Sequence, residues 1–263
     1  MVGPIGRRSR IGVVELHGAL GAAIRASAYY PLLDRLEKNA RIGCVVLDID
    51  SPGGSVSASE ALYLKVTRLR QKKPVVAFVR GSGTSGAYLV ACAASRIVAQ
   101  PGAILGSIGV ISLRPGVGEL MQRLGVSVSV NKSGPLKDMG AFYRPSTAEE
   151  EAKMQALVNE LFEDMVQRVA EARHRTVVQV RESATGEVYT ARRAMNLGLV
   201  DELGDFDTAL DAAASLGNVP RKVSYVRPPR PARLRMLERF VGWAMESAEE
   251  EAATALGRRL WYM

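Results

Sequence analysis

A serine in a glycine-rich turn is the first residue of this sequence whose surroundings could support covalent chemistry. Ser85 lies in the run Gly81–Gly86, after the apolar stretch Val75–Val79 and before the small-residue stretch Ala87–Ala94. A serine between a strand and a helix can expose its hydroxyl, and the N–H of the next residue, here Gly86, can point at a developing oxyanion. On its own, the run is more typical of an ordinary Gly/Ser-rich turn.

A second glycine turn follows the apolar run Cys44–Ile49. Its sequence, Asp50-Ser51-Pro52-Gly53-Gly54-Ser55, lets the backbone approach a ligand closely and offers free N–H donors. A phosphate-binding loop would carry a lysine directly after the glycines, and this turn does not. The remaining functional interpretation is an oxyanion hole lined by Gly53 or Gly54. A tight turn in which Ser55 caps the next helix is compatible with that interpretation.

No histidine is well placed to activate Ser85, although a Ser–His–Asp mechanism requires one. The chain has only His17, after the first expected strand, and His174, at the end of an expected surface helix. A buried lysine can act as the base instead, because desolvation disfavours the ammonium form and lowers its pKa. Lys137, in the irregular stretch 133–138, is one candidate, although a lone lysine in a loop is usually a solvated surface charge.

The elements that must position these residues alternate between strands and helices in the first half of the chain. Apolar and β-branched runs predict strands, and apolar residues at helical spacing predict helices. Continuous apolar strands between helices are typical of parallel β–α units covered on both faces. We expect strands at 11–16, 44–49 and 75–79 and helices at 28–40, 57–70 and 87–94.

The second half is predominantly helical, with one further strand expected at 126–130. Ser146-Thr147-Ala148-Glu149 is interpreted as a capping box that begins a long amphipathic helix, which runs to about Arg173. Another helix is expected at 206–216. A Pro/Arg-rich linker then leads to a last helix at roughly 234–256.

The composition is that of an ordinary globular protein. Of the 263 residues, 47% are hydrophobic, and the net charge of +8 is spread along the chain, which favours a solvated surface over nucleic acid binding. Cys44 and Cys92 lie in apolar runs and are expected to be buried, and no metal site or cofactor is expected. Neither a signal peptide nor a run of ~20 apolar residues is visible, so we expect a soluble or peripheral protein.

Five motifs occur in the order and approximate spacing of the signal peptide peptidase A family, which this sequence resembles over roughly residues 10–216. Each is permissive alone, but five in order are specific. They are Ser51–Ser55, Gly83–Tyr88, Gly106–Ile111, Ser133–Asp138, and Gly186–Ala191 followed by Leu197–Asp201.

The resemblance implies an α/β fold of the ClpP/crotonase-like type, built from repeated β-β-α units, and a Ser–Lys dyad. Ser85 matches the nucleophile, Lys137 the general base and Ser107 a serine that orients the lysine. Gly54, with Gly53 as the near alternative, matches the oxyanion-hole donor. The implied activity is a serine endopeptidase that cleaves hydrophobic peptides, such as residual signal peptides or membrane-protein fragments, within a homo-oligomeric ring and without a cofactor.

The sequence departs from the family in two ways. Ala87 replaces a glycine in the usual Ala-Ser-Gly-Gly elbow, a change that a helix should tolerate. The N-terminal membrane anchor that family members usually carry is not seen here, so we expect either that it was removed from this sequence or that this member is soluble or held peripherally. We therefore expect a protease domain at 1–226 and a linker with an amphipathic helix at 227–263, which contacts either a neighbouring protomer or a membrane surface. The expected location is membrane-associated and peripheral, with a cytoplasmic location as the alternative.

Two other functions share the expected fold. A crotonase-type acyl-CoA enzyme would use the same oxyanion hole with acidic catalytic residues, for which only Asp50 is near. A non-catalytic scaffold would use the ring assembly alone, but the presence of both Ser85 and Lys137 argues against it.

Overall fold

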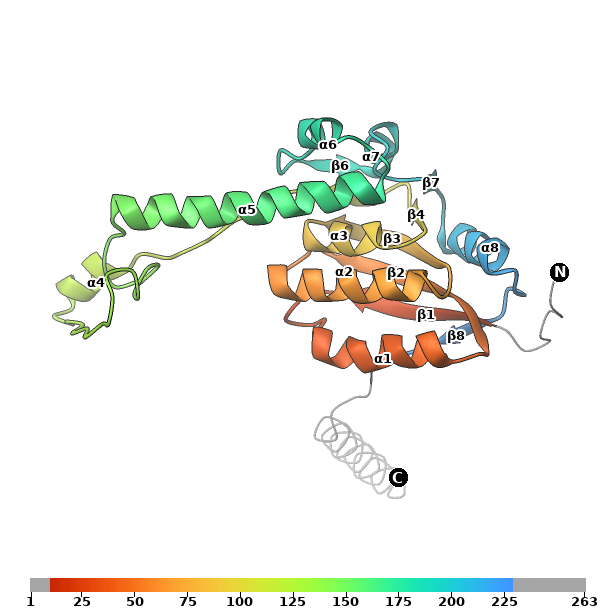
Figure 1. Ribbon diagram of the computed structural model, residues 1–263, viewed down its shortest axis with the longest axis horizontal. Coiled ribbons are helices and arrows are strands. Elements are labelled where there is room, and N and C mark those ends of the chain that lie inside the picture. Colours follow the sequence, from red (N-terminus) through yellow and green to blue (C-terminus); the bar gives the residue numbers. More distant parts are fainter. Residues whose placement is uncertain (1–9, 229–263) are drawn as a thin grey trace, which may run out of the picture. The chain divides into compact units, whose positions relative to one another are not determined.

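The computed structural model describes residues 10–228 and centres on a mostly parallel sheet (Figure 1). Eight strands in the described part of the chain form one sheet in the order β6-β5-β3-β2-β1-β8, while β4 pairs with β3 and with β7. All pairings are parallel except that of β5 with β6. The strands are β1 (Arg10–His17), β2 (Ile42–Ser51), β3 (Val75–Thr84), β4 (Arg96–Ala99), β5 (Ile104–Gly106), β6 (Val188–Thr190), β7 (Glu202–Leu203) and β8 (Val223–Tyr225).

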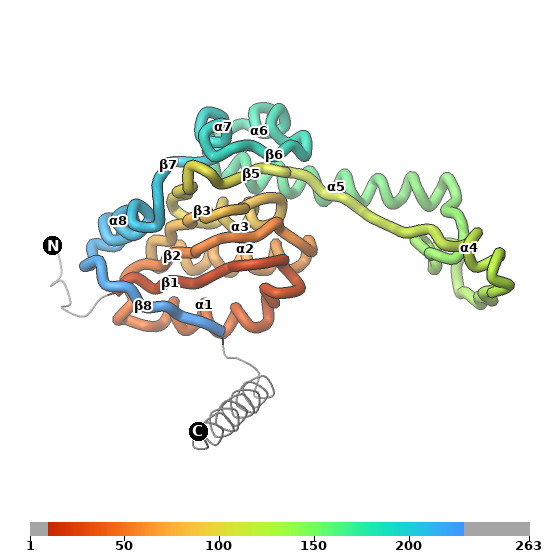
Figure 2. The backbone as a smooth tube through the Cα atoms, turned by 180° about the vertical axis from the view of Figure 1, so that it is seen from behind, coloured from red at the N-terminus to blue at the C-terminus, as the bar shows by residue number. Residues whose placement is uncertain are grey.

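Helices connect these strands and cover both faces of the sheet (Figures 1 and 2). Helices α1, α2 and α3 lie on one face, and α8 lies on the other. The helices are α1 (Ala26–Lys38), α2 (Val56–Arg70), α3 (Gly86–Cys92), α4 (Gly118–Arg123), α5 (Ala148–Ala172), α6 (Val177–Ser183), α7 (Ala191–Asn196) and α8 (Phe206–Gly217).

Side chains on the three central strands point alternately to the two faces of the sheet and form one hydrophobic core on each face. On β2, Val45 and Leu47 face the larger core beneath α1, α2 and α3, while Cys44 and Val46 face the smaller core beneath α8. Because successive side chains of a strand point to opposite faces, a continuous apolar run is what a sheet covered on both sides requires. The prediction of parallel β–α units is therefore confirmed.

The strand β1 is paired on both sides. Beyond its pairing with β2, its edge is covered by β8, more than 200 residues later in the sequence. The N–H of Ile11 donates to the carbonyl of Lys222, and the N–H of Val226 donates to the carbonyl of Val13, each at 2.8 Å. The described residues up to Val226 form one compact unit.

A long extension, here called the arm (residues 111–147), leaves the body of this unit and returns through α5 (Figures 1 and 2). At 1.5 Å per residue, the 25 residues of α5 span about 37 Å, so the helix reaches well beyond the body. Its C-terminal half packs on the body through Met165, Val166 and Val169, which are buried.

Two predictions of local structure are wrong. Residues 126–130 form no strand: their alternating valines fit a strand pattern, but they lie in the arm, away from the sheet to which they would have to pair. The capping box is displaced by one residue, because Thr147 is the N-cap of α5 and pairs reciprocally with Glu150, not with Glu149.

The C-terminal segment, membrane-spanning helices and the two cysteines were also predicted from the sequence. The predicted linker and C-terminal helix, residues 227–263, lie outside the described residues apart from Arg227 and Pro228, so the division at residue 226 stays a prediction. Within residues 10–228, no helix combines the length and apolar character needed to cross a bilayer. Cys44 and Cys92 are free and buried, as predicted.

Candidate active site

Ser85 occupies a strained turn between β3 and α3. Its backbone has φ +54° and ψ −126°, in the positive-φ region that residues other than glycine rarely adopt. The turn is held in place because the N–H of Ser85 donates to the carbonyl of Gly106 at 2.8 Å, which extends the pairing of β3 with β5. Ser85 itself remains partly exposed. This is the geometry of a nucleophile elbow.

The glycine turn predicted as an oxyanion hole packs directly against this elbow. A side chain on Gly53 would meet the backbone N of Gly86 and the carbonyl of Thr84, each at 2.8 Å, and one on Gly54 would meet the carbonyl O of Leu20 at 2.1 Å. Both positions have positive φ, so only glycine fits them without strain.

The two glycines differ in what their N–H groups do. The N–H of Gly53 donates to the Ser51 hydroxyl at 3.2 Å. Around Gly54, the N–H of Leu20 donates to the carbonyl of Gly53, and the N–H of Ser55 donates to the carbonyl of Leu20. The N–H of Gly54 itself has no hydrogen-bond partner among residues 10–228. The N–H of Gly86 is at the first position of α3 and therefore has no partner within the helix. The N–H groups of Gly54 and Gly86 are therefore better placed than that of Gly53 to donate to an oxyanion.

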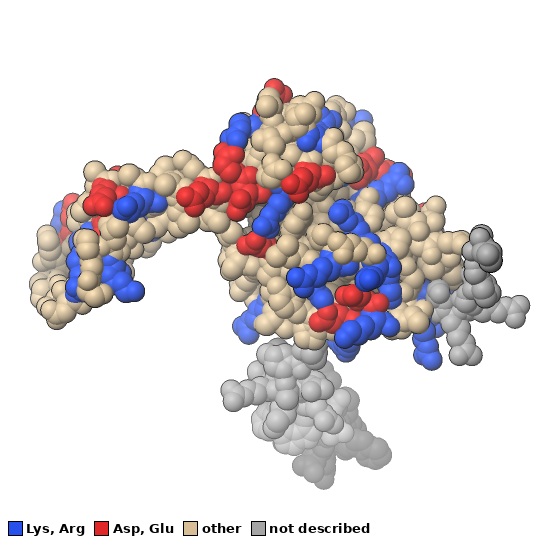
Figure 3. Space-filling model, in the orientation of Figure 1, with Lys and Arg blue, Asp and Glu red and all other residues tan. Residues whose placement is uncertain are grey.

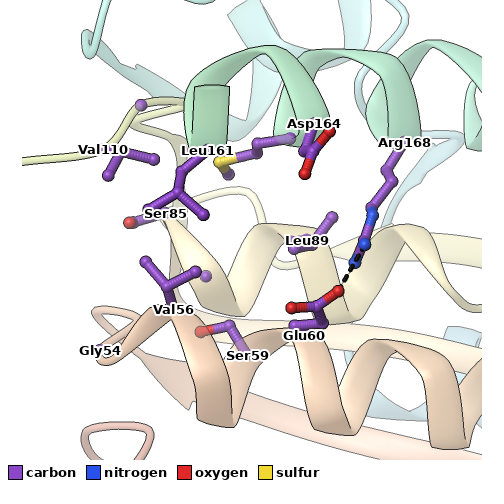
Figure 4. Close-up of a pocket in the computed structure, with 13 residues that line it drawn as sticks. Gly54, Val56, Ser59, Glu60, Ser85, Leu89, Val110, Leu161, Asp164 and Arg168 are labelled. Carbon is purple, nitrogen blue, oxygen red and sulfur yellow. Dashed lines mark hydrogen bonds and ion pairs between the residues drawn. The ribbon is translucent and has the colours of Figure 1, made fainter. Parts of the chain in front are cut away.

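Two cavities open at Ser85 and Gly54. The first lies between α2, α3 and the C-terminal half of α5 (Figure 4). The second is larger and includes Ser107, so the structure brings Ser107 and Ser85 to the same cavity. Ser107 also has positive φ, +48°, and its N–H donates to the carbonyl of Glu187 at 2.7 Å. Neither His17 nor His174 lines either cavity.

Lys137 is not brought to Ser85 within the chain. It lies exposed in the arm and lines neither cavity. In Figures 1 and 2 the loop between α4 and α5, which carries it, lies at the far end of the arm from α3. Ser85, Ser107, Gly53, Gly54 and Gly86 are therefore assembled by one chain, and Lys137 is not.

An ion-pair network ties the Lys137 loop to the start of α5. The Asp138 carboxylate accepts hydrogen bonds from Lys132 at 2.7 Å and from Tyr143 and Arg144 at 3.0 Å each. Arg144 also donates two hydrogen bonds, at 2.9 and 2.6 Å, to Glu150, whose side chain is buried.

The same contacts shift both carboxyl groups toward their charged forms. Arg144 and Lys132 hold the pKa of Asp138 well below its usual range. Arg144, with help from the backbone N–H of Thr147, lowers the pKa of Glu150 to about 2. A carboxylate that accepts several hydrogen bonds is stabilised in its charged form. The loop is therefore fixed to its own helix, but not to the body.

Sequence reasoning missed the side chains that wall the first cavity away from Ser85. Those of α5 recur at helical spacing, so one face could have been identified, but the sequence does not show that this face meets α2 and α3. The residues are Val56, Ser59 and Glu60 of α2, Leu89 of α3, and Leu161, Asp164, Met165 and Arg168 of α5.

Comparisons with known proteins find relatives that are named as proteases. A Methanocaldococcus jannaschii protein provisionally named a protease is 44% identical over 203 residues, which are 76% of this chain and 65% of that protein. The chloroplastic serine protease SPPA of Arabidopsis thaliana is 28% identical over 244 residues, which are 88% of this chain and 36% of that protein. The chain thus spans less than two thirds of the length of either relative.

The fold is also found among solved structures. A ClpP1 variant from Listeria monocytogenes superposes with a TM-score of 0.51 at 18% identity, over 74% of this chain and 92% of that one. At this identity the likeness concerns the fold alone, and it confirms the predicted ClpP-like α/β fold. Residues 67–220, more than half of the chain, match the family model described as peptidase family S49. The resemblance to signal peptide peptidase A is confirmed, and the chain belongs to peptidase family S49.

Proposed function

We propose that this protein is a serine endopeptidase in which Ser85 is the nucleophile and Lys137 the general base. The observation that carries the proposal is the strained elbow of Ser85, placed beside the unpartnered N–H of Gly54 and the first N–H of α3. Backbone strain of this kind costs free energy and is found mainly at functional sites.

In the proposed reaction, the Ser85 hydroxyl oxygen attacks the peptide carbonyl while its proton passes to the neutral amine of Lys137. The N–H groups of Gly54 and Gly86 stabilise the oxyanion of the tetrahedral intermediate. As that intermediate collapses, the lysine gives the proton to the departing amine. Water, activated by the same lysine, then hydrolyses the acyl-enzyme. Ser107, on the second cavity, orients the lysine.

We propose that Lys137 reaches Ser85 from a second copy of the chain within a ring. Two features support this: Lys137 lies in the arm away from Ser85, and the arm exposes apolar side chains that the described residues leave uncovered. Exposed apolar patches of this kind mark interaction surfaces. The exposed fractions are 79% for Ile111, 83% for Leu113, 56% for Leu120, 70% for Leu124 and 52% for Phe142.

Hydrophobic peptides are the proposed substrates. Apolar side chains line both cavities at Ser85, among them Val56, Leu89 and Met165 in the first and Ile111 and Phe162 in the second. Residual signal peptides and fragments of membrane proteins have this character, and we propose a peripheral membrane location on the same ground. Asp50, the acid considered for the acyl-CoA alternative, lines neither cavity, and its carboxylate accepts a hydrogen bond from the N–H of Ser82.

The experiment is complementation between two inactive variants. Ser85→Ala and Lys137→Ala should each lower hydrolysis of a hydrophobic peptide at least about 10³-fold. Refolded together in equal amounts, they should regain about one quarter of the wild-type activity, because a site formed by two randomly mixed neighbours is intact in that share of cases.

The controls separate the parts of this proposal. Lys153→Ala, which removes an exposed lysine of α5, should leave activity unchanged. Full activity in either single variant would refute the dyad. A mixture that stays inactive, although native mass spectrometry shows mixed rings, would refute its assembly from two chains.

A further inference from the structure

The first cavity has a polar end that hydrophobic substrates alone do not explain. Ser85 and Gly86 are among the residues that line it, and its empty space of about 470 Å³ includes space that is open to solvent. Apolar side chains of three helices form its walls. At the end away from Ser85, it is lined by Glu60, Asp164 and Arg168 (Figure 4).

Two of these three charges neutralise each other. The Arg168 guanidinium donates a hydrogen bond of 2.5 Å to the Glu60 carboxylate and also lies over the ring of Tyr63, 5.3 Å from its centroid. Arg168 is therefore held on two sides and is not available to bind an anionic ligand.

The Asp164 carboxylate has no such partner. No hydrogen bond or ion pair to it is found among residues 10–228, and in Figure 4 it points from α5 into the space between Leu89 and Arg168. Figure 3 shows further acidic side chains along the middle of α5, of which Glu163 is paired with Arg181 and Glu160 is exposed. The end of the cavity thus carries one uncompensated negative charge.

We propose that this cavity receives the side chain that precedes the scissile bond, and that Asp164 makes it favour lysine or arginine there. The inference rests on the proposed role of Ser85. Leu89, Leu161 and Met165 contact the aliphatic stem, and the Asp164 carboxylate accepts a charge-assisted hydrogen bond from the terminal cation.

This preference is compatible with hydrophobic substrates, because membrane segments carry Lys and Arg at their ends. In the proposed arrangement, a basic residue at the edge of such a segment occupies the first cavity. The apolar residues beside it then lie along the second cavity, against Ile111, Val158 and Phe162.

The test uses two peptides that differ in one atom group. Both have the same hydrophobic sequence, with either lysine or norleucine before the scissile bond; norleucine keeps an unbranched aliphatic stem but has no ammonium group. We expect kcat/KM of the wild type to be about fivefold higher for the lysine peptide, a modest factor because Asp164 is exposed. In Asp164→Asn, the ratio should fall to about one.

A matched control removes the same charge nearby. Glu160 is exposed one turn earlier on α5 and does not line the cavity, so Glu160→Gln should keep the fivefold ratio within about a factor of two. A wild-type ratio of one, or a ratio that Asp164→Asn leaves unchanged, would overturn the inference. Thermal unfolding of each variant verifies that the comparison is made on folded protein.

Failure of the proposed function would look different. In that case the wild type would hydrolyse neither peptide, and a fluorophosphonate would not label Ser85. Hydrolysis that depends on Ser85 but does not distinguish lysine from norleucine would overturn the role of Asp164 alone.

Discussion

The region around Ser85 and the region around Lys137 are built by different physical means. Ser85 sits on a buried parallel sheet, and its position is set by backbone hydrogen bonds and by glycines that no other residue could replace. Lys137 sits in a solvent-exposed loop, tied by ion pairs to one end of a long helix. One chain therefore determines the position of the proposed nucleophile, whereas the position of the proposed base depends on what the arm contacts.

The largest expected difference between the two regions concerns glycine. Gly54→Ala adds a methyl group that meets the backbone of Leu20 at a positive φ, and we expect a loss of about 3 kcal/mol in the free energy of unfolding together with loss of activity. Gly134, in the arm, has open space where a side chain would be, so Gly134→Ala should change that free energy by less than about 0.5 kcal/mol. Denaturant unfolding of both variants measures the two effects. Equal effects would mean that the body does not restrict its glycines more than the arm does.

The arm should lose stability in acid before the sheet does. The pKa values of Asp138 and Glu150 are lowered in the folded chain, so the stability that they contribute is present above their unfolded values and is lost as pH falls through the folded values. From about pH 4.5 down to about pH 2, amide exchange at residues 118–147 should rise relative to β2 and β3, after correction for intrinsic rates. In Glu150→Gln the arm should exchange faster already at pH 7. An arm as protected as the sheet at pH 2 would contradict the role of this network.

The smallest expected difference between the two regions is in the reactivity of cysteine thiols. Burial raises the pKa of Cys44 to about 11 and that of Cys92 to about 12, so neither should react with a thiol reagent at pH 8 in the folded protein. A cysteine introduced by Lys137→Cys should react quickly in dilute solution and, if the arm contacts a second copy as proposed, more slowly at high protein concentration. Labelling followed by mass spectrometry distinguishes the three sites. Equal labelling at all concentrations would argue against contact between the arm and another copy.

The parts predictable from sequence are those set by neighbouring residues. The elbow of Ser85 and the turn of Gly53 and Gly54 are local combinations of glycine, strand and helix, so their conformations followed from short segments. The alternating valines of 126–130 show the limit of this reasoning, because a strand needs a partner and the arm supplies none.

The parts that could not be predicted depend on which surfaces meet. Asp164 and Arg168 lie about 100 residues from Glu60, and nothing in their local sequence indicates that α5 packs on α3 so that Arg168 reaches Glu60 of α2. The position of Lys137 relative to Ser85 is harder still to predict, since no contact within the described residues brings the two side chains together.

The pairing of β1 with β8 has a consequence for how the protein is made. The strand that covers the edge of β1, Val223–Tyr225, is synthesised only after more than 200 further residues. During that interval the nascent sheet exposes an unpaired apolar edge, the kind of surface that chaperones bind and that promotes aggregation. The rate of translation through this region should therefore influence the yield of folded protein.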